Sequence, residues 1–183
     1  MSKTKRLFVL RHAKSSWDDP GLDDHERPLA TRGRQAVQVL AEHVRANDIR
    51  PAQVLCSSAR RTRETLEGVA PGGETLIESD LYAAGADELL DRLRRVSDGI
   101  DSVMVIGHNP ALQSIVLRLS NGGGSDGDDS FRAQVSHKFP TGALATLSFD
   151  CSWSELAPGC AHLVDYVRPK AIARRATSAP VSE

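Results

Sequence analysis

Short apolar runs alternate with amphipathic segments along the first two thirds of the chain, and this alternation restricts the fold more than any other feature. The clearest runs are residues 7–10 (LFVL) and 103–106 (VMVI), and polar residues follow each of them at once. An apolar run without polar alternation is typical of a strand that is buried on both faces. Four strands alternating with helices predict an α/β fold, with a mostly parallel sheet flanked by helices on both faces.

The other elements follow from periodicity and from Gly and Pro positions. We expect strands at 7–10, 53–56, 75–77 and 103–106, with helices from residue 31 and over 60–69, 86–96 and 110–119. Two further strands are expected at the sheet edge, over 142–149 and 161–167, after a mobile Gly/Asp/Ser-rich loop at 121–130. Residues 169–183 lack apolar periodicity, so we expect one domain over 1–168 and a disordered tail.

The composition excludes several classes of protein. The 183 residues suit one compact domain, and the net charge of −1 with only 4% aromatic residues argues against nucleic-acid and membrane partners. The apolar run at 7–10 is far shorter than the roughly 7–15 residues of a signal peptide core. Cys56, Cys151 and Cys160 have no metal or redox spacing, and their odd number favours a reducing cytoplasm.

Polar residues gather where the predicted strands end. Arg11-His12 and Gly107-His108 each close a buried strand, residues 57–61 (SSARR) close another, and Asp80 follows the weak third one. The carboxyl ends of parallel strands meet at the edge where ligands bind in open α/β sheets. Arginine donors match phosphate oxygens, and a neutral histidine can attack phosphorus. The sequence therefore predicts a phosphate site at this edge.

Three stretches carry a resemblance to a known family. Residues 10–17 (LRHAKSSW), 58–65 (SARRTRET) and 107–110 (GHNP) resemble, in order, the three motifs of the histidine phosphatase superfamily. Residues 24–29 (DHERPL) with Gly33, and 138–143 (KFPTGA) with Trp153, resemble its SixA-type phosphohistidine phosphatases. The resemblance spans roughly residues 7–170. One departure is Ala13, which stands where the superfamily has a glycine.

The resemblance implies a fold, an activity and a set of site residues. The fold would be the histidine phosphatase, or phosphoglycerate mutase-like, fold. His12 would attack phosphorus and water would hydrolyse the phosphohistidine, while Arg11, Arg61 and His108 stabilise the transferring group. Ser15, Arg27 and Asn109 would bind substrate. No cofactor and no metal are expected, because the arginines supply the positive charge.

The favoured substrate is phosphohistidine on a protein, and the proton donor stays open. No glutamate falls clearly where many superfamily members keep an acid, and Asp80, Asp87 and Glu88 are the nearby candidates. An enzyme without a well-placed acid should prefer phosphoramidates to alkyl phosphates. A small-molecule phosphomonoesterase of the same superfamily is the alternative. The sequence does not identify the physiological substrate or the oligomeric state.

Other interpretations of the same residues remain. His12 or His108 alone is more often a structural residue, and Arg60 and Arg63 beside Arg61 are more typical of a solvated helix face. Cys56 precedes the arginine cluster as in cysteine-dependent phosphatases, but it stands one residue too close to Arg61 for their Cys-x5-Arg spacing. A phosphate-binding module without catalysis is a further alternative, which the full set of two arginines and two histidines disfavours.

Overall fold

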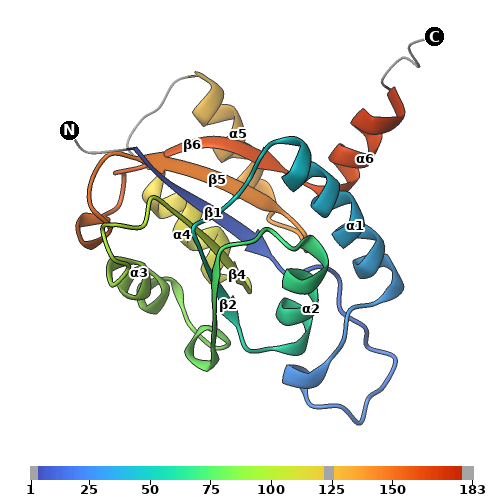
Figure 1. Ribbon diagram of the computed structural model, residues 1–183. Helices are drawn as coiled ribbons and strands as arrows, with labels where there is room; N and C mark the ends of the chain where they lie inside the picture. Colours follow the sequence, from blue (N-terminus) through green and yellow to red (C-terminus); the bar gives the residue numbers. More distant parts are fainter. Residues whose placement is uncertain (1–3, 122–125, 179–183) are drawn as a thin grey trace.

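Six strands form one mixed sheet in the computed structural model, which describes residues 4–121 and 126–178 (Figure 1). The strand order is β3-β2-β4-β1-β5-β6. The strands are β1 (Lys5–Arg11), β2 (Gln53–Ser57), β3 (Glu74–Glu78), β4 (Ser102–Gly107), β5 (Leu144–Phe149) and β6 (His162–Val167). The first four run parallel, and β5 pairs antiparallel with both β1 and β6. The predicted mostly parallel α/β sheet is confirmed.

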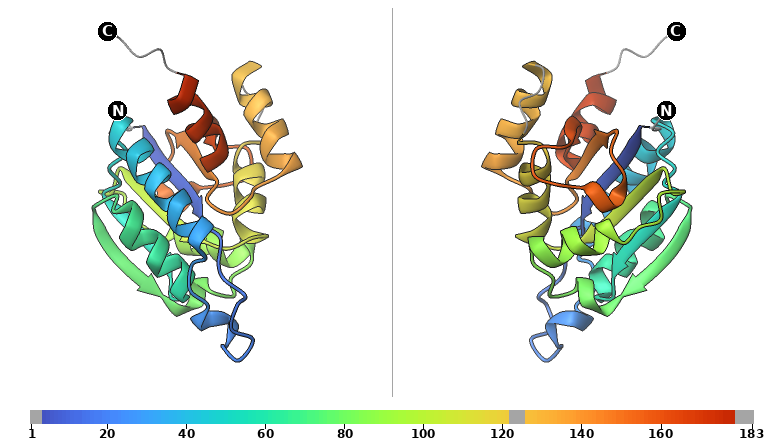
Figure 2. Two further views of the ribbon diagram at one scale, coloured as in Figure 1. Left: turned by 90° about the vertical axis from the view of Figure 1, so that its right-hand side faces the viewer. Right: turned by 90° about the vertical axis from the view of Figure 1, so that its left-hand side faces the viewer.

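Helices cover both faces of this sheet (Figures 1 and 2). One face carries α1 (Thr31–Ala46), α2 (Arg60–Val69) and α6 (Pro169–Ser178), and the other carries α3 (Ala86–Arg94), α4 (Ala111–Leu119) and α5 (Asp126–His137). Within β1, Leu7 and Val9 pack into the core on the α3–α5 side, whereas Phe8 and Leu10 pack into the core on the α1–α2 side. The period of two along a strand thus fills two cores from one uninterrupted apolar run.

Two segments differ from the expectation. Residues 169–178 form helix α6 rather than a disordered tail, because Ile172 packs against the core beside α1 and gives the segment an anchor. Helix α5 begins at Asp126, inside the predicted loop at 121–130. Residues 122–125 of that loop and 179–183 of the tail lie outside the described residues. Among the residues that the structure describes, none of the helices is both long enough and apolar enough to cross a membrane.

The sheet brings distant residues to one edge. The main-chain N–H of His12 donates to the Gly107 carbonyl (3.1 Å), so β1 and β4 end side by side. Because β5 runs antiparallel to β1, it starts at this edge, where the Gly142 N–H donates to the carbonyls of Arg11 and His12 (3.1 and 3.0 Å). Gly142 has a φ of +77°, a conformation that glycine adopts without strain. The end of β1 is therefore fixed from both sides.

Candidate active site

His12 lies directly beyond β1 and is only 7% exposed. Its Nδ1 lies 2.7 Å from the carbonyl oxygen of Ala13, so Nδ1 carries a proton and donates it, and Nε2 keeps a free lone pair. The following Ala13 N–H donates to Thr65 Oγ1 on α2 (3.0 Å). Burial lowers the pKa of His12 to about 3, and the nearby His108, Arg61 and Arg11 add to the effect. The imidazole is thus neutral at physiological pH.

His108 lies beyond β4 with its ring centroid 5.3 Å from that of His12. Its Nε2 lies 2.8 Å from Ser57 Oγ at the end of β2, and its Nδ1 lies 3.5 Å from a terminal nitrogen of Arg61. Since a guanidinium only donates, Nδ1 accepts and Nε2 carries the proton. Burial lowers the pKa of His108 to about 4, with Arg61 as the next cause. The two predicted histidines therefore meet, and both are neutral.

Arg61 is the arginine of its cluster that faces the two histidines. It is only 7% exposed, and its terminal nitrogens donate to the main-chain oxygen of Asp24 (2.6 Å) and to Asp24 Oδ2 (3.0 Å). Arg60 instead pairs with Glu64 one helical turn along α2, and Arg63 is exposed. Cys56 is fully buried in β2, and burial raises the pKa of its thiol to about 12, which does not suit a nucleophile.

Arg11 and Asn109 approach the site from another side. The Arg11 side chain and the Asn109 amide both donate to the carbonyl oxygen of Phe139 (2.9 and 3.1 Å), in the segment that leads into β5. The Arg11 Nε is buried and has no hydrogen-bond partner among the described residues. An unpaired buried donor costs free energy, which an anion bound beside it would recover. Arg11 therefore adds unused positive donor capacity to the site.

A carboxylate that the sequence analysis treated only as part of a family motif lies in the middle of this site. Asp24, in the short helix η1 (Asp24–Glu26), accepts through Oδ2 from Tyr82 O–H (2.7 Å) as well as from Arg61, and through Oδ1 from Arg27 (2.8 Å). The hydrogen bond from Tyr82, followed by those from Arg27 and Arg61, lowers the pKa of Asp24 well below its usual range. Asp24 is therefore ionised and orients its three donors.

The predicted residues Ser15 and Arg27 belong to the same network. Arg27 is buried and donates to Ser15 Oγ (2.7 Å) and to the Ser16 carbonyl (2.9 Å) in addition to Asp24. Its contacts thus tie the segment after His12 to the carboxylate that holds Arg61. Ser15 and Arg27 are thus linked to Arg61 through Asp24.

Two rings near the site were not predicted, Tyr82 beside His108 and His25 beside Tyr82. Tyr82, which follows the short helix η2 (Ser79–Leu81), packs edge-on against His108 (centroids 5.6 Å apart) and His25 (4.9 Å). His25 Nε2 in turn lies 2.9 Å from Ser58 Oγ. Both rings come from irregular segments that carry no periodic pattern, so only their closeness in sequence to Asp24 and Asp80 could have pointed to them.

The three candidate acids do not reach the histidines through any hydrogen bond or ion pair of the described residues. Asp80 is exposed on η2, while Asp87 pairs with Arg118 (2.8 Å). Glu88 accepts from the Gly85 N–H (3.0 Å) and caps the start of α3. Asp87 thus forms a surface ion pair, and Glu88 stabilises the start of α3.

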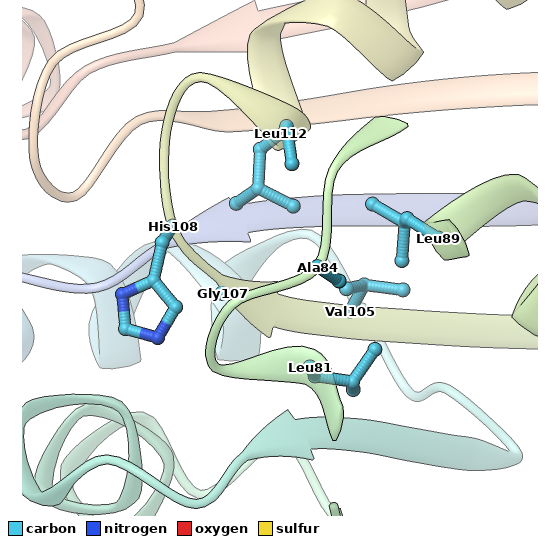
Figure 3. Close-up of a pocket in the computed structure, with 8 residues that line it drawn as sticks. Leu81, Ala84, Leu89, Val105, Gly107, His108 and Leu112 are labelled. Atoms are coloured by element: carbon cyan, nitrogen blue, oxygen red, sulfur yellow. The ribbon is translucent and has the colours of Figure 1, made fainter. Parts of the chain in front are cut away.

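The space beside His108 on the α3 side is small and apolar. Figure 3 shows Leu81, Ala84, Leu89, Val105 and Leu112 closing it, with the His108 ring turned away from them. Its volume is about 10 Å³, close to that of one water molecule. A substrate must therefore approach His108 from the side of His12 and Arg61.

The segment between His12 and α1 is held against that helix. The Ala30 N–H donates to the Lys14 carbonyl (2.8 Å), and Ser15 pairs with Leu29 as an isolated antiparallel bridge. Gly33, in the first turn of α1, lies so close to the Lys14 carbonyl that a Cβ would overlap it. The two ends of this segment are thus fixed, and its middle projects beyond the sheet (Figure 2).

Known proteins match this chain in sequence over most of its length. The family model of the histidine phosphatase superfamily, branch 1, matches residues 7–82. An uncharacterised protein from Mycobacterium tuberculosis is 34% identical over 161 residues, which cover 88% of this chain and 100% of that protein. The phosphohistidine phosphatase SixA of Escherichia coli is 25% identical over 152 residues, 79% of this chain and 86% of that protein.

Solved structures match the fold as well. A protein from Nakamurella multipartitia, provisionally named phosphohistidine phosphatase SixA, superposes with a TM-score of 0.79 at 28% identity, over 91% of this chain and 97% of that chain. The matched relatives and the arrangement of the strand-end residues agree with the resemblance seen in the three sequence motifs. The chain belongs to the histidine phosphatase superfamily.

Proposed function

We propose that this phosphatase removes phosphate from phosphohistidine on a protein, through a phosphohistidine intermediate on its own His12. Membership of the superfamily supports the phosphatase activity, and the nucleophile and the substrate are our proposal. The observation that carries it is the state of His12, whose Nδ1–H is bound to the Ala13 carbonyl and whose Nε2 is unprotonated and free. A neutral, oriented imidazole nitrogen is the form that can attack phosphorus.

The reaction proceeds in two displacements. His12 Nε2 attacks phosphorus in line, a new P–N bond forms, and the P–N bond to the substrate imidazole breaks. The electron pair of that bond stays on the leaving imidazole nitrogen, and the ring leaves as neutral imidazole because its other nitrogen has taken up a proton from solvent before the bond breaks. Water then attacks the phosphorus on His12, the second P–N bond breaks, and inorganic phosphate leaves with His12 restored.

Charge stabilisation falls to three side chains. Arg11 and Arg61 have donors left for the equatorial phosphoryl oxygens, which carry the charge of the transition state. His108 carries its proton on Nε2, and a phosphoryl oxygen can share that proton's hydrogen bond with Ser57, which keeps the ring oriented. Ser15 and Arg27 act on the substrate through Asp24 and Arg61, and Asn109 acts beside Arg11. Because the arginines supply positive charge, we predict that activity survives a chelator.

The substrate class follows from the proton balance. Asp24 is ionised and bound by three donors, so it is a poor acid. Asp87 and Glu88 make their contacts elsewhere, and Asp80 is exposed and makes no hydrogen bond or ion pair with the histidines among the described residues. An alkoxide leaving group needs an acid far more than an imidazole does. The relative from Escherichia coli is a phosphohistidine phosphatase by name, which agrees with this preference.

A comparison of substrates tests the proposal. Purified protein should hydrolyse a phosphohistidine peptide with a kcat/KM well above that for a set of sugar phosphates, and it should incorporate acid-labile, base-stable phosphate. Vanadate should inhibit the reaction, and a chelator should leave it unchanged. A preference for a sugar phosphate would instead identify a small-molecule phosphomonoesterase. Loss of activity in chelator with recovery in Mg²⁺ would contradict the metal-free mechanism.

A further inference from the structure

The segment between His12 and α1 exposes an apolar surface beside the candidate active site. Four large hydrophobic side chains are exposed among the described residues, and two of them, Trp17 (70% exposed) and Leu22 (37%), lie on this segment. The other two, Ile77 and Val164, lie on the outermost strands β3 and β6. An exposed tryptophan next to a binding site is a common anchor in protein recognition.

A buried arginine holds the Trp17 ring in place. The guanidinium carbon of Arg27 lies 3.1 Å from the centroid of the Trp17 ring, and Arg27 itself is only 6% exposed. Arg27 also donates to Ser15, Ser16 and Asp24, so the ring rests on a side chain that three further contacts fix. The ring therefore has one supported face and little conformational freedom to lose on binding.

A groove lies beside Arg27, and its lining includes Ser16 and Asp18, the two residues that flank Trp17 in the sequence. Its volume is about 360 Å³, and its lining includes Asp19, Leu22, Arg27, Pro28, Ala30 and Arg34. In the proposed reaction, one phosphoryl group and one imidazole would lie among His12, Arg61 and His108. The groove is therefore additional room for what surrounds the phosphorylated side chain, which only a polymeric substrate possesses.

The charge of the segment complements that of the phosphate site. Residues 18–27 contain five carboxylates and one arginine, whereas the site next to them presents Arg11 and Arg61. Asp24 and Glu26 are bound by Arg27, Arg61 and His25, while Asp18, Asp19 and Asp23 make no ion pair among the described residues. Among the described residues, Arg34 donates only to the uncharged Leu29 carbonyl and Thr31 hydroxyl, so its charge opposes part of this negative charge.

We propose that Trp17, Leu22 and the adjacent groove form a docking surface for the protein that carries the phosphohistidine, and that this surface selects lysine and arginine residues flanking it. The phosphoryl group would lie on the arginines of the site, the flanking cations beside Asp18, Asp19 and Asp23, and an apolar side chain on the open face of Trp17. This inference depends on the proposed function for its substrate and adds the recognition of the chain around it.

Substrates that differ only in their surroundings test the surface. The probes are free phosphohistidine, a phosphohistidine peptide with flanking lysines, and the same peptide with flanking glutamates. Wild type should show a kcat/KM about 10-fold or more higher for the lysine peptide than for the glutamate peptide. Trp17→Ala should lower kcat/KM about 10-fold for the lysine peptide, mainly through KM, and change it less than about 2-fold for free phosphohistidine. Val164→Ala, at another exposed apolar position, is the matched control.

Removal of the charges gives a second test. The Asp18→Asn/Asp19→Asn variant should abolish most of the preference for lysine over glutamate peptides, and Glu42→Gln/Glu67→Gln, which removes two exposed charges from α1 and α2, should leave it intact. An equal loss on all three substrates in Trp17→Ala would mean that Trp17 acts on the site through Arg27, and would overturn docking. Unchanged constants would overturn it as well.

A readout without turnover separates this inference from the proposed function. The chain has two tryptophans, and Trp153 is fully buried, so a change in intrinsic fluorescence on adding peptide reports Trp17. The lysine peptide should quench the fluorescence of the His12→Ala variant with saturation, and the His12→Ala/Trp17→Phe variant should lose that signal. If wild type hydrolyses none of the three substrates, the proposed function fails. Absence of saturable quenching would overturn docking on its own.

Discussion

His12 and His108 lie 5.3 Å apart at the ends of neighbouring strands, yet different parts of the protein hold them. The Nδ1 of His12 is bound to a main-chain carbonyl, and main-chain hydrogen bonds to Gly107 and Gly142 fix its backbone. The ring of His108 is bound by two side chains, Ser57 and Arg61. Side-chain substitutions can therefore retune His108, whereas they leave the orienting contact of His12 in place.

The difference assigns the two rings different tasks. A nucleophile must keep one lone pair aimed at phosphorus, and a backbone contact secures this whatever the neighbouring side chains are. A group that binds the phosphoryl oxygens must adjust as charge moves, and side-chain partners allow this. Substitutions at the two rings and at their partners should therefore differ in how strongly they affect covalent labelling and turnover.

Replacement of His12, the proposed nucleophile, should have the largest effect. His12→Ala should lower kcat/KM by about 10⁴-fold or more and abolish phosphate labelling of the protein, because no other group can form the covalent intermediate. His108→Ala should lower the rate strongly while some labelling persists. Labelling is measured with phosphohistidine peptide carrying radioactive phosphate. Normal labelling of the His12→Ala variant would reverse the assignment of the two rings.

Loss of the arginine that contacts His108 should come next. Arg61→Ala should reduce kcat/KM about 10³-fold, since it removes transition-state charge stabilisation and a partner of His108. Arg60→Ala and Arg63→Ala are matched controls on the same helix, and each should change kcat/KM less than about 3-fold. The three variants are compared on one substrate at equal protein stability. A larger loss in Arg60→Ala would show that the wrong arginine has been assigned to the site.

The pH dependence of stability should separate the two rings. The folded-state pKa is about 3 for His12 and about 4 for His108, both below the ordinary 6.5. The unfolded chain therefore binds more protons between about pH 6.5 and 4, and the free energy of unfolding falls as the pH falls through this window. Between pH 7 and pH 5, each ring should lower the free energy of unfolding by about 1–2 kcal/mol.

Urea unfolding at several pH values measures this dependence. His12→Gln and His108→Gln should each show a shallower fall in the free energy of unfolding than wild type. Between pH 4 and pH 3 the fall in the free energy of unfolding due to His12 should continue, because its folded-state pKa is about 3. The fall due to His108 should level off near pH 4. Identical slopes in wild type and in both variants would contradict the neutral, buried state of the rings.

A smaller loss of activity is expected from a substitution that removes one hydrogen bond of His108. Ser57→Ala removes the hydroxyl that binds His108 Nε2, which should lower kcat about 5-fold, in line with the loss of one hydrogen bond. Labelling of His12 should remain. Ser58→Ala, whose hydroxyl contacts His25, is the matched control. A loss of labelling in Ser57→Ala would mean that the two histidines are not held independently.

The smallest effects are expected from the distant acids. Asp87→Asn removes an exposed ion pair with Arg118, and Glu88→Gln weakens the cap of α3, so kcat/KM should stay within about 2-fold of wild type. Both are assayed with phosphohistidine peptide and with a sugar phosphate. A collapse on the sugar phosphate in either variant would identify the missing acid of a monoesterase.

The sequence predicted the parts of the site that follow regular strands. His12 and His108 end buried apolar runs, so the geometry of a parallel sheet brings them together. Arg61 was placed by its spacing from Ser58 and Thr65, and its side chain does face the histidines. These positions could be predicted because each depends on a periodic element of known direction.

The sequence did not reveal the contacts made by irregular segments. Asp24 and Tyr82 come from short 3-10 turns, and their meeting depends on tertiary packing that no local pattern encodes. Helix α6 was missed because the packing of Ile172 against the core is a tertiary contact that no apolar periodicity in residues 169–183 indicates. The two strands predicted at the sheet edge do lie there as β5 and β6, but the sequence did not indicate that β5 pairs antiparallel with β1.

The strand order also dictates when the site can exist during synthesis. β1 is the first strand to leave the ribosome, but its neighbours in the sheet are β4 and β5, which begin at residues 102 and 144. Until β4 and β5 emerge, the apolar strand β1 has neither of its pairing partners, and an unpaired apolar strand is prone to aggregation. The Phe139 carbonyl that binds Arg11 arrives later still than His108. A nascent chain therefore carries His12, its proposed nucleophile, long before the site is assembled, and the last third of the chain, which supplies Phe139 and β5, completes it.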